Sequence, residues 1–233
     1  MGKETEQKQE IVNQGVHTYS QEEAYVWPEE PVLREQLEWF QDQKLALMVH
    51  WGVYNQLGMV ASWALSDEDA EWSRKTVDWT DDGEVFKRQY RALNRAFDPV
   101  AFQPEEWAKM AKECGFRYLI LTTKHHDGFC LWSSEYTDYD IASTKYKNGK
   151  GDILEEISDA CTEYNLDMGC YLSPWDIYED KYGCFGDNNN KKNNHNQGSE
   201  KGTFTDYNEL YVAWINEICQ AKKADGSYKY GNN

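Results

Sequence analysis

The feature that most constrains this chain is a short apolar run that ends in a dense group of polar side chains. The run Tyr118–Leu121 is apolar throughout and rich in residues that favour β-strands. It is typical of a strand buried on both faces of a parallel sheet. The sequence Lys-His-His-Asp follows at 124–127, and Gly128 turns the chain away. A histidine pair at a strand end can be purely structural, but this four-residue group favours a functional site, because the carboxyl ends of barrel strands form an active face.

Two further predicted strands also end in polar or aromatic residues. The strand Leu45–Val49 is followed by His50, and the strand Asp167–Leu172 is followed by Ser-Pro-Trp-Asp at 173–176. Helical patterns at 104–114, 152–164 and 207–221 separate or follow the strands. Alternating strands and helices without a Gly-x-Gly-x-x-Gly motif predict an α/β fold of the (β/α)8 TIM-barrel type. Such a barrel needs eight strands and about 250 residues, so the three or four recognised here predict a barrel cut after about half its strands.

The sequence predicts two parts of unequal size. Residues 1–40 form a polar segment and a leading helix, and residues 41–233 form the N-terminal part of the barrel domain. Residues 54–95 show no regular pattern, and a connection of this length is usually functional. Residues 186–202 are polar and of low complexity, which predicts a solvated loop on the active face in which His195 is incidental.

Composition limits the partners of the chain. The net charge of −17, from 24 basic and 41 acidic residues, argues against nucleic acid and against an anionic membrane surface. No apolar run approaches the roughly 20 residues that a membrane helix needs. The six cysteines form no C-x-x-C pair, so they favour a reducing compartment over a zinc site. With no signal region visible, a cytoplasmic location is favoured, and a secreted or periplasmic one applies if a leader was trimmed.

Three motifs together resemble the retaining α-L-fucosidases. They are His50-Trp-Gly52, Thr122-Thr-Lys-His-His-Asp-Gly-Phe129 and Tyr171-Leu-Ser-Pro-Trp-Asp176, and the resemblance covers roughly residues 45–221. The Lys-His-His-Asp-Gly-Phe element is its specific part. The resemblance implies a barrel catalytic domain followed by a smaller β-sandwich, no metal and no cofactor. It also implies a fucosylated glycan or oligosaccharide as partner, and it indicates no oligomeric state.

The resemblance also implies a set of sugar-binding residues. Carried over by position, these are His50, Trp63, His125, His126 and Tyr171. Glu71-Trp72 is a rival to Trp63 for the aromatic position in the loop after the first strand. Neutral imidazoles suit a sugar with several vicinal hydroxyls, because one ring nitrogen donates and the other accepts. An aromatic wall suits the methyl group and the apolar ring face of fucose.

Retaining hydrolysis needs two carboxyl groups about 5–5.5 Å apart. The resemblance implies that the nucleophile is an Asp in a Trp-x-Asp-Gly-like motif after the next strand. Asp225-Gly226 lacks the apolar run before such a motif and is interpreted as a turn, while Asp127 and Asp176 are assigned to orienting their neighbours. We therefore expect the nucleophile and the acid/base beyond Asn233, and residues 1–233 alone to be inactive.

Two other functions remain open on the sequence. Residues His50, His125, His126 and Asp127 are possible ligands of a metal-dependent hydrolase, although adjacent histidines in a strand point to opposite faces. A non-catalytic sugar-binding module is the other alternative. Within the fucosidase interpretation, the motifs at 129–132 and 171–176 resemble the subgroup that acts on branched α-1,3/1,4-fucosides.

Overall fold

The computed structural model describes residues 26–66, 71–177 and 207–231 of the 233-residue chain. The polar segment before residue 26, the loop at 186–202 and Cys184 lie outside these ranges. The chain divides into one unit that ends at Asp42 and a second that begins at Gln43. In the first unit, helix α2 (Pro31–Asp42) confirms the helical pattern predicted there. The Glu30 carboxylate accepts a hydrogen bond from the backbone N–H of Val32 at 3.1 Å, at the start of this helix.

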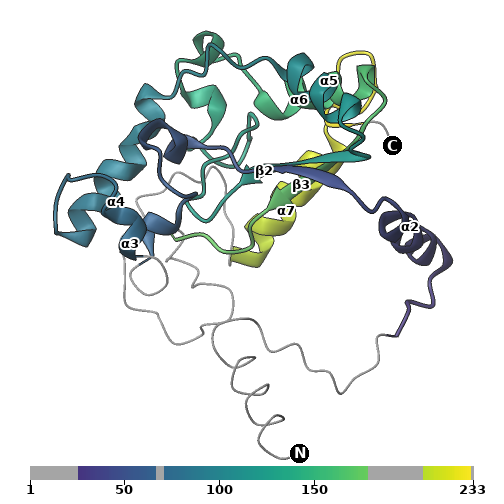
Figure 1. Ribbon diagram of the computed structural model, residues 1–233, viewed down its shortest axis with the longest axis horizontal. Helices are drawn as coiled ribbons and strands as arrows, with labels where there is room; N and C mark the ends of the chain where they lie inside the picture. Colours follow the sequence, from purple (N-terminus) through teal and green to yellow (C-terminus); the bar gives the residue numbers. More distant parts are fainter. Residues whose placement is uncertain (1–25, 67–70, 178–206, 232–233) are drawn as a thin grey trace, which may run out of the picture. The chain divides into compact units, whose positions relative to one another are not determined.

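The second unit is built on a three-stranded parallel sheet in the order β1-β2-β3 (Figure 1). The strands are β1 (Ala46–Val49), β2 (Tyr118–Lys124) and β3 (Asp167–Leu172). This confirms the predicted parallel α/β arrangement, while the complete eight-stranded barrel stays a prediction. Strand β2 is three residues longer than predicted. Tyr118 and Ile120 are half-buried, whereas Leu119 and Leu121, which point to the other face, are buried, so the first half of β2 is not buried on both faces.

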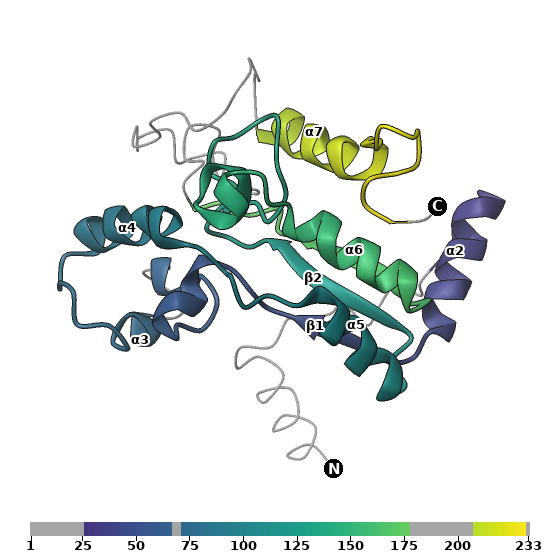
Figure 2. The same cartoon turned by 90° about the horizontal axis from the view of Figure 1, so that it is seen from above.

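Helices α5 (Pro104–Glu113) and α6 (Ile153–Glu163) pack against each other and against β2 (Figure 2). Pro104 occupies the first turn of α5, where its missing N–H costs nothing. The sequence pattern predicts that Trp107, Met110, Ala111 and Cys114 form the apolar stripe of this helix. That prediction is partly wrong, because Met110 is 44% exposed and Cys114 is also exposed. The buried face consists of Pro104, Ala108 and Ala111, whose small size and i, i+4, i+7 spacing fit close packing.

Helix α7 (Tyr207–Gln220) lies beside β3 and buries the predicted residues Leu210, Trp214 and Ile218 (Figure 1). The Tyr211 hydroxyl on α7 donates to the carbonyl of Leu172 at the end of β3, at 2.9 Å. None of the described helices is long and apolar enough to cross a membrane.

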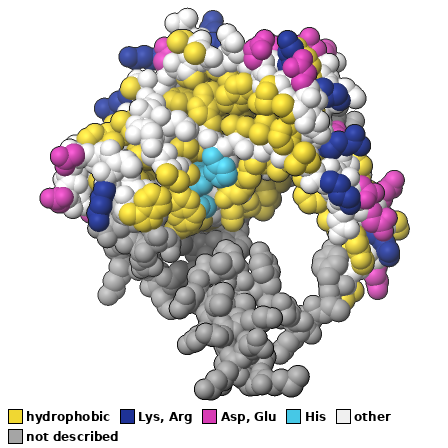
Figure 3. Space-filling view, in the orientation of Figure 1, with side chains coloured by type: hydrophobic (Ala, Val, Ile, Leu, Met, Phe, Trp, Pro, Cys, Tyr) yellow, Lys and Arg dark blue, Asp and Glu magenta, His cyan; other side chains and the backbone are white. Residues whose placement is uncertain are grey.

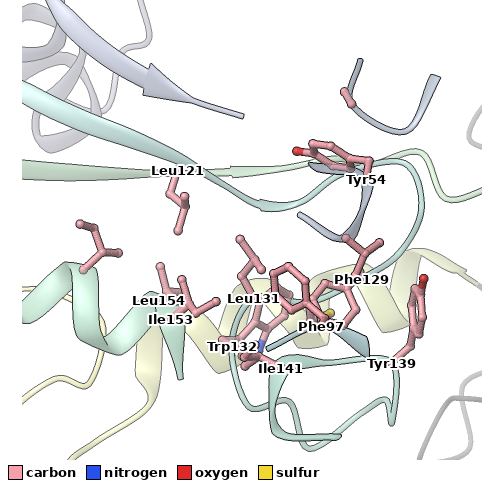
Figure 4. Close-up of a cluster of buried hydrophobic side chains, with 14 of the residues drawn as sticks. Tyr54, Phe97, Leu121, Phe129, Leu131, Trp132, Tyr139, Ile141, Ile153 and Leu154 are labelled. Atoms are coloured by element: carbon pink, nitrogen blue, oxygen red, sulfur yellow. The ribbon is translucent and has the colours of Figure 1, made fainter. Parts of the chain in front are cut away.

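The segment after β2 runs through the hydrophobic core (Figure 4). Phe129, Leu131 and Trp132 are at most 2% exposed, and they pack in one cluster with Leu121 of β2 and Ile153 of α6. The Leu131 N–H donates to the carbonyl of Thr123 at 2.9 Å, which ties this segment back to the strand. The polar residues between β2 and this segment are therefore anchored at both ends.

Residues 54–95 are not irregular, as the sequence indicated, but a series of short helices. These are η1 (Val53–Leu57), η2 (Trp63–Leu65), α3 (Glu71–Arg74), α4 (Gly83–Arg91) and η3 (Ala92–Ala96). Most are too short to show a helical repeat in the sequence. Asp82 caps α4 by accepting from the N–H groups of Glu84 and Val85, and α4 buries Phe86 and Tyr90.

Candidate functional site

The carboxyl ends of the three parallel strands bring the predicted site residues to one edge of the sheet. Val49 pairs with Leu121, so His50 follows β1 at the level of Thr122, and Thr122 pairs with Tyr171. Paired residues of parallel strands lie on the same face of the sheet. The register alone therefore places the His50 and Tyr171 side chains near each other, and their ring centroids are 6.1 Å apart.

The Thr122 hydroxyl fixes the direction in which the chain leaves β1. Its Oγ1 accepts from the Trp51 N–H at 3.0 Å and lies 3.3 Å from the carbonyl oxygen of Val49. The Trp51 ring packs against the Phe102 and Trp107 rings, at centroid distances of 4.8 and 5.2 Å. His50 lies between Val49 and Trp51 in the chain, and both are held by Thr122, so the backbone position of His50 is set by these contacts.

Adjacent residues of a strand point to opposite faces of the sheet. His125 and His126 instead lie side by side. The reason is that β2 ends at Lys124, and a turn follows in which the Gly128 N–H donates to the His125 carbonyl at 3.1 Å. The two imidazole centroids are 4.2 Å apart, and His50 lies 5.7 Å from His125. The three predicted histidines thus form one cluster.

Aromatic rings surround this cluster. Trp63 lies 4.9 Å from His126, and Tyr171 stacks on His125 at 6.0 Å between centroids. Trp175, which was not predicted to contact a ligand, lies 5.0 Å from His126. Its position in the Ser-Pro-Trp-Asp motif after β3 was the signal available in the sequence. Figure 3 shows histidine atoms exposed among hydrophobic side chains, so a ligand there would meet both polar and apolar groups.

Trp72, the rival candidate for the aromatic position, differs from Trp63 in its exposure to solvent. Trp72 is 58% exposed, whereas Trp63 is half-buried against the histidines. The side chain of Glu71 lies outside the described ones. Trp63 is therefore the aromatic residue of this loop that the structure places at the cluster.

Burial sets the charge state of the histidines. It lowers the pKa of His125 to about 3, and the positive charges of His126, His50 and Lys124 add to this effect. Burial, followed by the charge of Lys124, lowers the pKa of His126 to about 4. Burial also lowers the pKa of His50. His125 and His126 are consequently neutral at pH 7, and each ring presents one donor and one acceptor.

Lys124 is a structural part of the strand end. Its ammonium group is fully buried and lies 3.1 Å from the Asp176 carboxylate, and it donates to the Ser173 carbonyl and the Tyr207 hydroxyl at 3.2 Å each. The Trp175 carbonyl lies 3.5 Å away as a fourth acceptor, so all three N–H groups of the ammonium have partners. The pair ties the end of β2 to the segment after β3 and to α7, which fixes the loop that carries Trp175.

Asp127 is likewise held by its neighbours. The Tyr90 hydroxyl of α4 donates to its carboxylate at 2.7 Å, and the Phe129 N–H donates at 3.2 Å. Burial raises the pKa of Asp127 to about 6, against the lowering effect of these two hydrogen bonds. Among the described residues, no group of three or more His, Cys, Asp or Glu side chains is placed to hold a metal ion. The proposed four-residue metal site is therefore not assembled.

The turn predicted at Asp225-Gly226 is confirmed. The Gly226 N–H donates to the Lys223 carbonyl at 2.9 Å, the φ of Gly226 is 87°, and Asp225 accepts from the Ser227 N–H at 3.0 Å. Its carboxylate is exposed and lies in a reverse turn, as expected for a residue without a role in the cluster.

Comparison with known proteins agrees with this geometry. Residues 12–229 match the family model described as alpha-L-fucosidase. The chain belongs to the α-L-fucosidase family. It is 39% identical over 122 residues to alpha-L-fucosidase 1 of Arabidopsis thaliana, an alignment that covers 52% of this chain and 20% of the plant protein. It is 33% identical over 180 residues to putative alpha-L-fucosidase 1 of rice, covering 77% of this chain and 29% of that relative.

A solved family member has a similar fold. Alpha-L-fucosidase isoenzyme 1 from Paenibacillus thiaminolyticus superposes with a TM-score of 0.59 at 27% identity, over 80% of this chain and 40% of that one. The chain therefore spans about a fifth to two fifths of the length of these three family members. Family membership is shown for this chain, and the matched region includes the whole histidine cluster.

Proposed function

We propose that this chain forms the fucose-binding part of a retaining α-L-fucosidase, with His50, Trp63, His125, His126 and Tyr171 as its sugar-binding residues. The observation that supports this most strongly is the cluster of three imidazole rings beside Trp63 and Tyr171. In this cluster the ring centroid of His125 lies 5.7 Å from that of His50 and 4.2 Å from that of His126. Its substrate would be a glycan or oligosaccharide that ends in α-L-fucose. This proposal rests on the family match together with the geometry at the strand ends.

The chemistry of the cluster suits a deoxy sugar. Each neutral imidazole can donate one hydrogen bond and accept another, so vicinal hydroxyls meet partners of both kinds. The rings of Trp63, Tyr171 and Trp175 offer apolar faces to the sugar ring and to the methyl group that replaces a hydroxymethyl group in fucose. A sugar with a hydroxyl at that carbon would bury a polar group against an aromatic wall, at a cost of about 1–3 kcal/mol if it finds no partner.

We propose further that the catalytic carboxyl pair is supplied by residues beyond Asn233. Asp127 is engaged by Tyr90 and Phe129, and Asp176 is engaged by Lys124. Neither arrangement resembles the two free carboxyl groups, about 5–5.5 Å apart, that retaining hydrolysis requires. In this proposal residues 41–233 form the first part of a TIM barrel, and the remaining strands complete both the barrel and the site.

The test is fucoside hydrolysis by the longest form of the protein that its gene encodes. His50→Ala and His125→Ala should each remove a hydrogen bond to the sugar, at about 1–3 kcal/mol, or roughly 5- to 150-fold in kcat/KM on an aryl α-L-fucoside. His195→Ala, the same substitution where the sequence predicts no ligand, is the control. Full kcat/KM in both site variants would disprove the assignment, and fucose binding without any hydrolysis would favour the sugar-binding module instead.

A further inference from the structure

Two buried serines hold the same ring nitrogen of the two adjacent histidines. The Ser62 hydroxyl contacts Nδ1 of His125, and the Ser173 hydroxyl lies 2.5 Å from Nδ1 of His126. Both serine side chains are completely buried. Ser62 comes from the loop after β1 and Ser173 directly follows β3, so two different segments converge on the end of β2. With both Nδ1 atoms occupied, Nε2 is the ring nitrogen that each histidine has left for a ligand.

The hydrogen bonds of Ser173 determine where the proton of His126 lies. The Ser173 hydroxyl donates to the Trp175 carbonyl at 2.9 Å and accepts from the Trp175 N–H at 3.2 Å. A hydroxyl has one proton, which is already used, so its oxygen can only accept from His126. The His126 ring also forms a hydrogen bond with the Trp175 backbone, whose carbonyl lies beside Nδ1 because Ser173 contacts both. In this arrangement the proton of His126 is on Nδ1, and its Nε2 is left as the acceptor.

Ser62 donates a hydrogen bond to His125, whereas Ser173 accepts one from His126. Within the described part of the chain, His125 Nδ1 is the recorded hydrogen-bond partner of its hydroxyl. Buried hydroxyl protons are nearly always given to an acceptor. Ser62 therefore donates to Nδ1, and the ring proton of His125 lies on Nε2. Burial keeps both rings neutral at pH 7, because it lowers the pKa of His125 to about 3 and that of His126 to about 4, so each ring carries a single N–H.

We propose that Ser62 and Ser173 are positioning residues that set opposite tautomers in the two adjacent rings. His125 then presents an Nε2–H donor next to the bare Nε2 acceptor of His126, with the ring centroids 4.2 Å apart. Such a pair fixes the hydrogen-bond roles of two neighbouring hydroxyls of a diol: one hydroxyl accepts from His125, and the other donates to His126. That the diol belongs to fucose rests on the proposed function, whereas the tautomers themselves do not.

The tautomers are measurable directly in the ligand-free protein. Long-range proton–nitrogen correlation spectra distinguish protonated from bare ring nitrogens at pH 7, and they are recorded on the longest form of the protein that its gene encodes, labelled with 15N-histidine. We expect the Nε2–H form for His125 and the Nδ1–H form for His126. In Ser62→Ala, His125 should become a mixture of tautomers while His126 keeps its form. Equal tautomers in the two rings of the unmodified protein would overturn the proposal, even where a variant fails to fold.

Affinity for L-fucose provides the second readout. Ser62→Ala and Ser173→Ala should each weaken binding by about 3- to 30-fold, as expected for a hydrogen bond made by a group that is no longer held in one form. The control is Ser158→Ala, because the Ser158 hydroxyl on α6 is buried and has no hydrogen-bond partner among the described residues. It should leave both tautomers and the affinity unchanged.

The two readouts separate this inference from the proposed function. Opposite tautomers in a protein that does not bind fucose would support the role of the serines and contradict the fucosidase proposal. Fucose binding with equal tautomers, or with a Ser62→Ala spectrum identical to that of the unmodified protein, would contradict the role of the serines and leave the proposed function supported.

Discussion

At the scale of single residues, the site contains titratable groups whose pKa values are shifted by burial. His125 and His126 are 4% and 8% exposed, and burial lowers the pKa of both. Asp127, next in sequence, is 1% exposed, and burial raises its pKa to about 6. Burial thus favours the uncharged form in all three residues. The fully buried ion pair between Lys124 and Asp176 lies directly beside them.

These shifts predict how stability depends on pH. Between about pH 4 and 6 the unfolded chain binds two more protons than the folded one at His125 and His126, and one fewer at Asp127. The net excess of one proton in the unfolded state means that these groups make stability rise with pH, and fall as pH drops below 6.5, by roughly 1.4 kcal/mol per unit. His125→Asn should cancel that slope. Urea unfolding at pH 4.5, 5.5 and 6.5 measures it, and equal slopes in the two proteins would contradict the assignment.

Most residues of the histidine cluster could be predicted from the sequence, but the serines that hold two of the rings could not. His50, His125, His126 and Tyr171 follow or end strands that the apolar pattern reveals. Ser62 lies 63 residues from its partner and Ser173 lies 47 residues from its own, so no local pattern links them. Their contacts exist only after the sheet has formed.

At the scale of elements, one glycine controls how the end of β2 meets the segment after β3. Gly128 has a φ of +77°, and a Cβ there would lie 2.5 Å from the Asp176 carboxylate. An added methyl group would push that carboxylate away from Lys124, its partner in the buried pair. The turn after β2 therefore needs glycine for two reasons, the backbone conformation and the space beside Asp176.

Gly128→Ala should consequently destabilise the protein by more than backbone strain alone explains. Gly115→Ala is a matched control, because Gly115 has a φ of +82° and no atom within 4 Å of an added Cβ. The control should cost about 1–2 kcal/mol from the left-handed conformation, and Gly128→Ala at least about 2 kcal/mol more from the disturbed buried pair. Equal losses in urea unfolding would show that the Lys124–Asp176 pair tolerates the methyl group.

The long elements could be predicted because they repeat a pattern, and the short ones could not. Helix α7 buries the three residues that its spacing indicated, and β3 has the predicted bounds. The short helices η1, η2 and α3 span five, three and four residues, which is too few for a 3.6-residue repeat to be visible. They matter for the site, since η2 carries Trp63.

At the scale of the whole molecule, the described strands form a three-stranded sheet and not a complete barrel. Strands β1 and β3 each pair with β2 alone in the described sheet, and Met48 of β1 is 42% exposed. The family match shows that the chain belongs to the α-L-fucosidase family, which the sequence predicted from three motifs. The complete barrel stays a prediction, because only three strands are found among the described residues.

Residues 1–233 expressed alone should therefore be aggregation-prone and inactive on fucosides. Unpaired sheet edges and uncovered apolar side chains favour association with other chains. Without a nucleophile, the covalent intermediate that divides the reaction into two easier steps cannot form. Expression beside the longer form, with both assayed on an aryl α-L-fucoside, measures this. Comparable turnover would show that a carboxyl pair exists within these residues, and Asp127, Asp176 and Asp225 would be the first to substitute.

Linkage preference also belongs to the whole molecule, because it depends on loops from several strands. The resemblance of the segments 129–132 and 171–176 to the subgroup that acts on branched α-1,3/1,4-fucosides predicts faster hydrolysis of a branched Lewis-type oligosaccharide than of an aryl fucoside. Competition between the two substrates in the longer form measures the ratio of kcat/KM. Preference for the aryl fucoside would contradict this prediction.

The most direct test of the sugar site is a crystal structure of the longer protein with L-fucose. The account predicts fucose hydroxyls within hydrogen-bond distance, about 2.7–3.2 Å, of Nε2 in His125 and His126 and of the His50 ring. It also predicts the sugar in contact with Trp63 and Tyr171. Fucose bound elsewhere, or a metal ion held by these histidines, would contradict the central claim.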